Sequence, residues 1–230
     1  MLIDLRGYGW MLVEGLWVTL LVGLSALAVA IVLGLAAAAA KLSGRRWLQV
    51  LAGLYTTVIR GIPELLLLLI VFYGTPTLIQ SLAARWGWDM VIDFDPFVAG
   101  VLTLGFIYGA FATEVFRGAF QAVPVGQIEA ARACGMSSRL TLRRIVLPQV
   151  WRFALPGLGN VWLILIKATA LVSVIQLDEL MRKAYIAMGA TKLPFNFFLV
   201  ASFLYLGITV VSMALQYRLE VWSNRGVRRA

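Results

Sequence analysis

Five long apolar stretches constrain the fold of this chain more than any other feature. Gly15–Ala40 contains no charged residue in 26 positions, and Leu193–Tyr217 contains none in 25. A helix needs about 20 apolar residues to cross the hydrocarbon core of a bilayer. Inside that core a helix satisfies all of its own backbone polar groups. We therefore predict an all-α integral membrane protein with five transmembrane helices, at residues 10–40, 48–82, 96–120, 153–178 and 193–218.

The overall composition agrees with a membrane protein. Apolar residues make up 61% of the 230 residues, charged residues make up 13%, and the mean hydropathy is +0.89. Soluble domains have roughly 45–50% apolar residues and about 25% charged residues. We expect one transmembrane domain, 1–230, in contact with the lipid bilayer. The net charge of +9 does not predict a nucleic-acid partner, because cationic loops also set membrane orientation and meet anionic lipid headgroups.

Residue types that the sequence lacks exclude several activities. There is no His, which removes His-based catalysis and most zinc sites. Cys134 is alone and cannot form an internal disulfide. There is no G-x-x-x-x-G-K-[ST] phosphate loop either. We therefore expect no catalytic residue, no metal and no cofactor bound by this chain. Charges at Asp4, Arg6 and Glu14 do not fit a cleaved signal peptide, so we expect the first span to be an uncleaved anchor.

The distribution of Lys and Arg predicts the orientation. With the N-terminus outside, 13 basic residues lie in the inner segments and five in the outer ones. Because basic residues are enriched in cytoplasmic loops, this bias favours an N-out, C-in arrangement. The loop at 121–152 then lies in the cytoplasm.

That loop contains the sequence EAARACGMSSRLTLRRIVLP, at Glu129–Pro148. The Glu-Ala-Ala start favours a helix, and Gly135 permits a left-handed turn. Ser137 or Ser138 can cap a second short helix, and Pro148 indicates its boundary. We predict a helix–turn–helix lying roughly parallel to the membrane. A generic amphipathic interfacial helix would explain the arginines, but it would not explain this spacing.

Four charged residues are candidates for positions deep within the predicted spans: Arg60, Glu64, Glu114 and Lys167. A charge at mid-bilayer costs at least about 2.5–3.5 kcal/mol, so each should face protein or water. Glu64 follows Arg60 by four residues with Pro63 between them. It is either the partner of Arg60 or a site for a cationic ligand. Lys167 could meet a ligand carboxylate or balance an acid on another span. Glu114, near the inner end of its span, is interpreted as structural.

Small residues predict close helix contacts. Ala36–Ala40 is a run of five alanines, and Gly105-x-x-x-Gly109 is a close-approach motif. Packing within one subunit is the favoured interpretation, and a dimer seam is the alternative.

Sequence elements from four of the five spans resemble one known family. These are WVTLLVGLSALAVAIVLG, TTVIRGIPELLLLLIVFYG, TEVFRGAFQAVPVGQIEAARACG and KATALVSVIQLDEL. They resemble the polar amino acid permeases of ABC importers over nearly the whole chain. The segment Glu129–Pro148 resembles the EAA loop with which such permeases contact their ATPase. The resemblance extends to the Q-type permease subunits of histidine/lysine/arginine/ornithine importers, and opine permeases are close relatives of these.

The resemblance implies a type I ABC-importer permease in the bacterial inner (cytoplasmic) membrane. It would move arginine, lysine, histidine or ornithine by alternating access, or an opine such as octopine or nopaline. It would not be an enzyme, because ATP and Mg would be bound by two separate ATP-binding subunits. The other implied partners are a second permease subunit, as an M-type heterodimer or a homodimer, and a periplasmic solute-binding protein.

The resemblance also implies two groups of functional residues. Those expected to couple to the ATPase are Glu129, Ala130, Ala131, Gly135, Ile145, Leu147 and Pro148. Those expected to bind substrate are Glu64, for a cationic side chain, then Lys167, Thr169 and Leu171, at the carboxylate end, and Tyr73, along the path.

Two other classes of protein would also carry apolar spans. An ion-coupled secondary transporter would explain the charges within the membrane, but it predicts internal repeats, and five spans show none. A non-transporting scaffold would not need charges at mid-span.

Overall fold

The computed structural model describes residues 4–88 and 90–224. The regular structure of these residues is helical throughout, with short π and 3₁₀ segments inside longer helices. The elements are α1 (Gly9–Leu42), α2 (Arg46–Gly61), α3 (Glu64–Leu69), η1 (Ile70–Gly74), α4 (Thr75–Arg85), α5 (Pro96–Gln121), α6 (Val125–Ala133), α7 (Ser138–Thr141), η2 (Leu142–Val146), α8 (Leu147–Ala168), η3 (Thr169–Ile175), α9 (Leu180–Thr191) and α10 (Pro194–Ser223).

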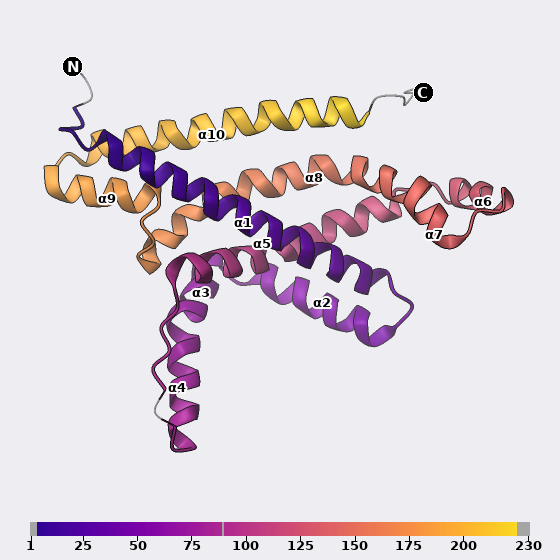
Figure 1. The fold of residues 1–230 in the computed structure, drawn as a ribbon, viewed down its shortest axis with the longest axis horizontal. Helices are drawn as coiled ribbons and strands as arrows, with labels where there is room; N and C mark the ends of the chain where they lie inside the picture. The colour runs from indigo at the N-terminus through magenta and orange to yellow at the C-terminus, as the bar shows by residue number, and fades with distance from the viewer. Residues whose placement is uncertain (1–3, 89, 225–230) are drawn as a thin grey trace.

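Five helical stretches of the described residues are long and apolar enough to cross a membrane, which confirms the predicted number of spans. They are Gly9–Leu42, Glu64–Arg85, Pro96–Gln121, Ser138–Ile175 and Pro194–Ser223. Helices α1, α5, α8 and α10 form an elongated bundle (Figure 1). Helix α9 lies at the end where the chain begins, and α6 and α7 lie at the opposite end. We did not predict α9, which falls in the expected outer loop.

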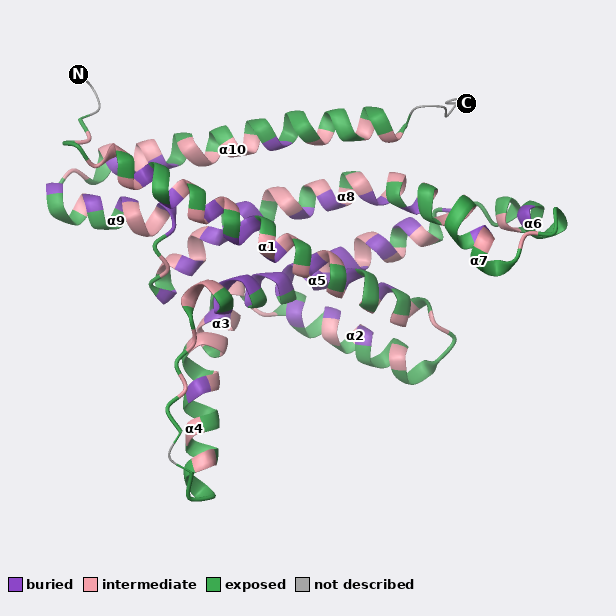
Figure 2. Cartoon of the chain, in the orientation of Figure 1, coloured by how far each residue is buried: buried purple, intermediate pink, exposed green. Residues whose placement is uncertain are grey.

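The most extensive contact of the bundle joins α1 to α5 through small residues. A Cβ added to Gly105 would come within 2.6 Å of Val29, and one added to Gly109 would come within 3.1 Å of Leu33. Ala26 and other small residues of α1 are fully buried at this contact. The glycine motif therefore packs within the chain, as predicted. Burial is concentrated on α5, whereas α4 and α10 are mostly exposed (Figure 2).

The predicted span at 48–82 is not one continuous helix. Helix α2 ends at Gly61, and Ile62 and Pro63 are extended, with ψ values of 137° and 132°. A proline disfavours helical backbone in the residue before it, which explains the break. Beyond it, α3 and η1 still contact α5, whereas α4 points away from the bundle (Figure 1).

Proline also explains both π segments. The N–H of Leu147 donates to the carbonyl of Leu142, five residues earlier, directly before Pro148. The same arrangement precedes Pro76. A proline ring clashes with the carbonyl four residues before it, and one wider π turn relieves that clash. We expected a boundary at Pro148, but the helix instead continues from Ser138 to Ile175.

Candidate functional site

Glu64 begins helix α3 directly after the break and is half-buried. Its Oε1 accepts a hydrogen bond of 3.0 Å from the hydroxyl of Tyr108. Tyr108 lies near the middle of α5 and is only 1% exposed. The break in the second span therefore holds a carboxylate against the midpoint of another span.

Arg60 does not pair with Glu64. The ion pairs found in the described parts of the chain involve other residues. The Arg60 guanidinium lies 5.2 Å from the centre of the Phe111 ring instead. It lines a polar cavity of about 440 Å³ together with Lys41 and Glu114. The structure therefore does not show Glu64 as the ion-pair partner of Arg60, which was one of the two roles left open for it.

The segment that contains Lys167 changes helix type within the span. Helix α8 ends at Ala168, and the chain continues as a 3₁₀ helix, η3, up to Gln176, which has a left-handed φ of 68°. The helix therefore tightens within this span. The side chain of Lys167 is exposed, whereas Thr169 is buried and its hydroxyl donates to the carbonyl of Ile166.

The predicted substrate residues come from elements that share one core. Leu171 of η3 packs against the same apolar cluster as Leu67 and Phe72, which lie in α3 and η1. Elements α3 and η3 contact each other and both contact α5. Tyr73 is 47% exposed, and its ring packs edge-on against Phe72. The Glu64 segment and the Lys167 segment thus meet on α5.

The predicted turn within Glu129–Pro148 is confirmed. Helix α6 ends at Ala133, and Gly135 has a left-handed φ of 77°. The N–H of Met136 donates to the carbonyl of Ala131, and the N–H of Gly135 donates to that of Arg132. These two bonds form a Schellman motif, which stops a helix at a left-handed residue. Ser137 then caps α7 by accepting from the N–H of Leu140.

Helix α6 is held to the long helix α8 by hydrogen bonds. The side-chain amide of Gln149 donates to Gln127 of α6 at 2.6 Å and to the carbonyl of Ile145 at 2.9 Å. Glu129 and Ala130 are exposed, whereas Ala131 is only 5% exposed. Ile145 is half-buried, and Leu147 and Pro148 are exposed. The exposed residues Glu129 and Ala130 thus lie on a helix that is hydrogen-bonded to α8.

Glu114 lies in a network of ion pairs and hydrogen bonds, only part of which could be predicted from the sequence. Its two carboxylate oxygens meet Lys41 at 2.5 Å and Arg117 at 2.8 Å. Lys41 also donates to the hydroxyl of Thr56. The ion pair of Glu114 with Arg117 is consistent with the structural interpretation of Glu114. The contribution of Lys41 depends on contacts among α1, α2 and α5, and no sequence signal indicated it.

Glu179 is a second residue that the sequence analysis did not single out. It is fully buried before α9, and its carboxylate accepts from the N–H groups of Met181 and Arg182. It also accepts from the hydroxyls of Thr19 and Tyr205, on α1 and α10. Burial raises the pKa of Glu179 to about 7, although these hydrogen bonds act in the opposite direction. Glu is not a typical helix-capping residue, so no sequence pattern indicated this role.

Comparison with known proteins gives consistent results. The family model described as "Binding-protein-dependent transport system inner membrane component" matches residues 30–223. The chain is 45% identical, over 226 residues, to the histidine/lysine/arginine/ornithine transport system permease protein HisQ of Salmonella typhimurium; the match covers 98% of this chain and 99% of that protein. It is 46% identical, over 224 residues, to the nopaline transport system permease protein NocQ of Agrobacterium fabrum, covering 96% and 94%.

A solved structure described as an amino acid ABC transporter with histidines is similar in fold. The TM-score is 0.80 and the sequence identity 30%, over 96% of this chain and 99% of that one.

Proposed function

The chain belongs to the family of binding-protein-dependent transport system inner membrane components, and from this membership we propose that it carries basic amino acids across the bacterial inner membrane as a permease subunit. The expected cargo is arginine, lysine, histidine or ornithine. The similarity to HisQ supports this cargo. The equally strong similarity to NocQ makes an opine the second candidate.

The carboxylate of Glu64 is what supports a cationic cargo most directly. It lies midway along a membrane-spanning bundle, is half-buried and has a hydroxyl as its hydrogen-bond partner. An ionised carboxylate in such a place gains most from an opposite charge. A cationic side chain of the cargo would supply that charge. The exposed ammonium of Lys167 and the backbone of η3 would then meet the carboxylate end of the cargo.

The energy for transport would come from partner chains. Two ATP-binding subunits, holding ATP and Mg, would contact the exposed face of α6 around Glu129, which requires an N-out, C-in orientation. A second permease subunit and a periplasmic solute-binding protein complete the proposed assembly. ATP binding would favour the outward-facing state, and inverting a 1:99 equilibrium to 99:1 takes about 5.5 kcal/mol. The Schellman turn and the hydrogen bonds of Gln149 would make α6 and α8 move together when ATP binds.

Uptake of radiolabelled arginine, histidine, ornithine and octopine tests the proposal in cells that express the whole transporter. Glu64→Gln should impair uptake of cationic substrates at least tenfold. Tyr108→Phe is its matched control, because it removes the hydrogen bond to Glu64 but leaves the carboxylate in place. Glu129→Ala should reduce the uptake of every substrate.

Different results would point to different errors. If Glu64→Gln leaves arginine uptake unchanged, Glu64 does not contact the cargo and specificity lies elsewhere. If Glu64→Gln and Tyr108→Phe are equally impaired, the carboxylate serves the packing of α3 on α5. If the wild type takes up octopine but none of the amino acids, the cargo is an opine.

A further inference from the structure

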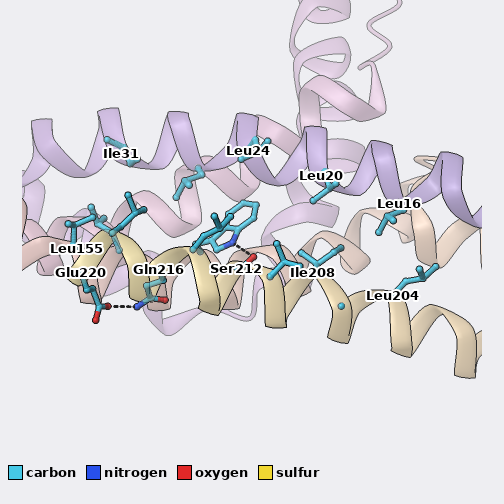
Figure 3. A pocket seen from close by; sticks show the side chains of 18 of the residues that line it. Leu16, Leu20, Leu24, Ile31, Leu155, Leu204, Ile208, Ser212, Gln216 and Glu220 are labelled. Carbon is cyan, nitrogen blue, oxygen red and sulfur yellow. Dashed lines mark hydrogen bonds between the residues drawn. The ribbon is translucent and has the colours of Figure 1, made fainter. Parts of the chain in front are cut away.

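An apolar groove runs along the bundle between α1, α8 and α10. It encloses about 690 Å³ and is lined mainly by apolar side chains of these three helices (Figure 3). On α1 the lining residues recur every three or four positions from Leu16 to Ile31. At its floor the indole N–H of Trp162 donates to the hydroxyl of Ser212 at 2.8 Å. Because these two polar groups hydrogen-bond to each other, the floor of the groove presents mainly apolar surface.

The dimensions of the groove indicate what fills it. The lining residues of α1 extend over about 22 Å, at 1.5 Å per residue. All three walls are membrane-spanning helices, so the groove opens to hydrocarbon. A single lipid acyl chain is thin enough to lie in it.

One end of the groove is polar. Gln216 and Glu220 line it there, and the Gln216 side-chain amide donates to Oε1 of Glu220 at 2.8 Å (Figure 3). Trp151 lines the same end and is 46% exposed, and tryptophan is enriched at the level of lipid headgroups. Among the described residues that line the groove, Glu220 is the charged one. A cationic headgroup complements it.

From this arrangement we propose that the groove binds one acyl chain of a phospholipid whose headgroup carries a primary ammonium. The ammonium donates to the carboxylate of Glu220, beside Gln216. A quaternary ammonium cannot donate this hydrogen bond, and a headgroup with only negative charge is repelled by Glu220. The site therefore selects phosphatidylethanolamine by its headgroup as well as by its chain.

Gly207 offers a clean way to fill the groove. It lines the groove on α10, and a Cβ added there meets no atom within 4 Å. Gly207→Phe therefore places a ring in the groove without disturbing the packing of α10. Val210→Phe is the matched control, because Val210 is 56% exposed on the same helix and does not line the groove. Leu24→Trp, on α1, is a second filling variant.

Native mass spectrometry of the full-length chain tests the proposal in detergent supplemented with phosphatidylethanolamine, phosphatidylcholine or phosphatidylglycerol of identical acyl chains. The wild type should retain one phosphatidylethanolamine per chain, at least fivefold more than either of the other lipids. Gly207→Phe and Leu24→Trp should lower this retention at least fivefold, whereas Val210→Phe should not. Glu220→Gln should keep the lipid but lose the preference for ethanolamine over choline.

Three results would overturn the proposal. The first is undiminished phosphatidylethanolamine on both filling variants while they melt like the wild type. The second is a preference of the wild type for phosphatidylglycerol, which would show that the basic loops, not Glu220, select the lipid. The third is the loss of chain-to-chain association in Gly207→Phe without loss of lipid, which would assign the groove to a second copy of this chain.

Discussion

Replacing Glu179 with Gln should make the stability of the bundle less sensitive to pH. Burial raises the pKa of Glu179 to about 7, whereas an ordinary Glu in the unfolded chain titrates near 4.5. Between these values the unfolded state releases a proton that the folded state still holds. Stability that is fully present below pH 4.5 is therefore lost as the pH rises to about 7.

The size of this effect follows from the difference in pKa. At 1.36 kcal/mol per pKa unit, the effect is on the order of 3 kcal/mol. For a chain of this length, 1 kcal/mol corresponds to roughly 2–4 °C in the midpoint of thermal unfolding. The midpoint should thus fall by about 6–12 °C from this residue alone. Gln stays neutral and should lose at most one hydrogen bond, worth about 1 kcal/mol at every pH.

Thermal unfolding of the full-length chain in detergent, followed at intervals from pH 4.5 to 8, measures the effect. The wild type should be the more stable protein at pH 4.5, and Glu179→Gln should become the more stable one above pH 7. Glu14→Gln is the control, because Glu14 lies at the same end of the bundle, 3.7 Å from Lys183, and is half-exposed. A constant difference between wild type and Glu179→Gln over this range would refute the reasoning.

The other predictions concern glycine contacts, the coupling turn and the Glu114 network. Gly105→Leu should cost about 1–3 kcal/mol in thermal unfolding, because its Cβ already clashes with α1, whereas Gly53→Leu should cost almost nothing, because no atom lies within 4 Å. Gly135→Val should cost about 1–2 kcal/mol at its left-handed φ and slow uptake without lowering the amount of protein in the membrane. Glu114→Gln should destabilise the chain by about 1–3 kcal/mol, and adding Lys41→Met should restore part of this loss in the same melts.

The features predicted correctly from sequence are those that depend on neighbouring residues. Hydropathy predicted the number of spans correctly, because a span must satisfy its own backbone within the bilayer. Gly135 and Ser137 indicated the turn in the coupling loop because helix caps are local structures. The features that were missed join distant segments: Lys41 meets Glu114 across 73 residues, and Glu179 meets Thr19 across 160. Neither pairing has a spacing that a sequence pattern could reveal.

Arg60 and Glu64 are subject to two opposing local effects, the gain from an ion pair within a helix and the cost of a proline between the two residues. An ion pair four residues apart stabilises a helix by about 0.2–0.5 kcal/mol, but only where the helix is continuous between the two side chains. Proline within a helix costs about 3 kcal/mol or more. Because the cost of the proline exceeds the gain from the ion pair, the chain is extended at Ile62 and Pro63 and the pair is lost. The break directs Glu64 to Tyr108, and the carboxylate is left without a cation among the described residues, which is the condition that a cationic cargo would satisfy.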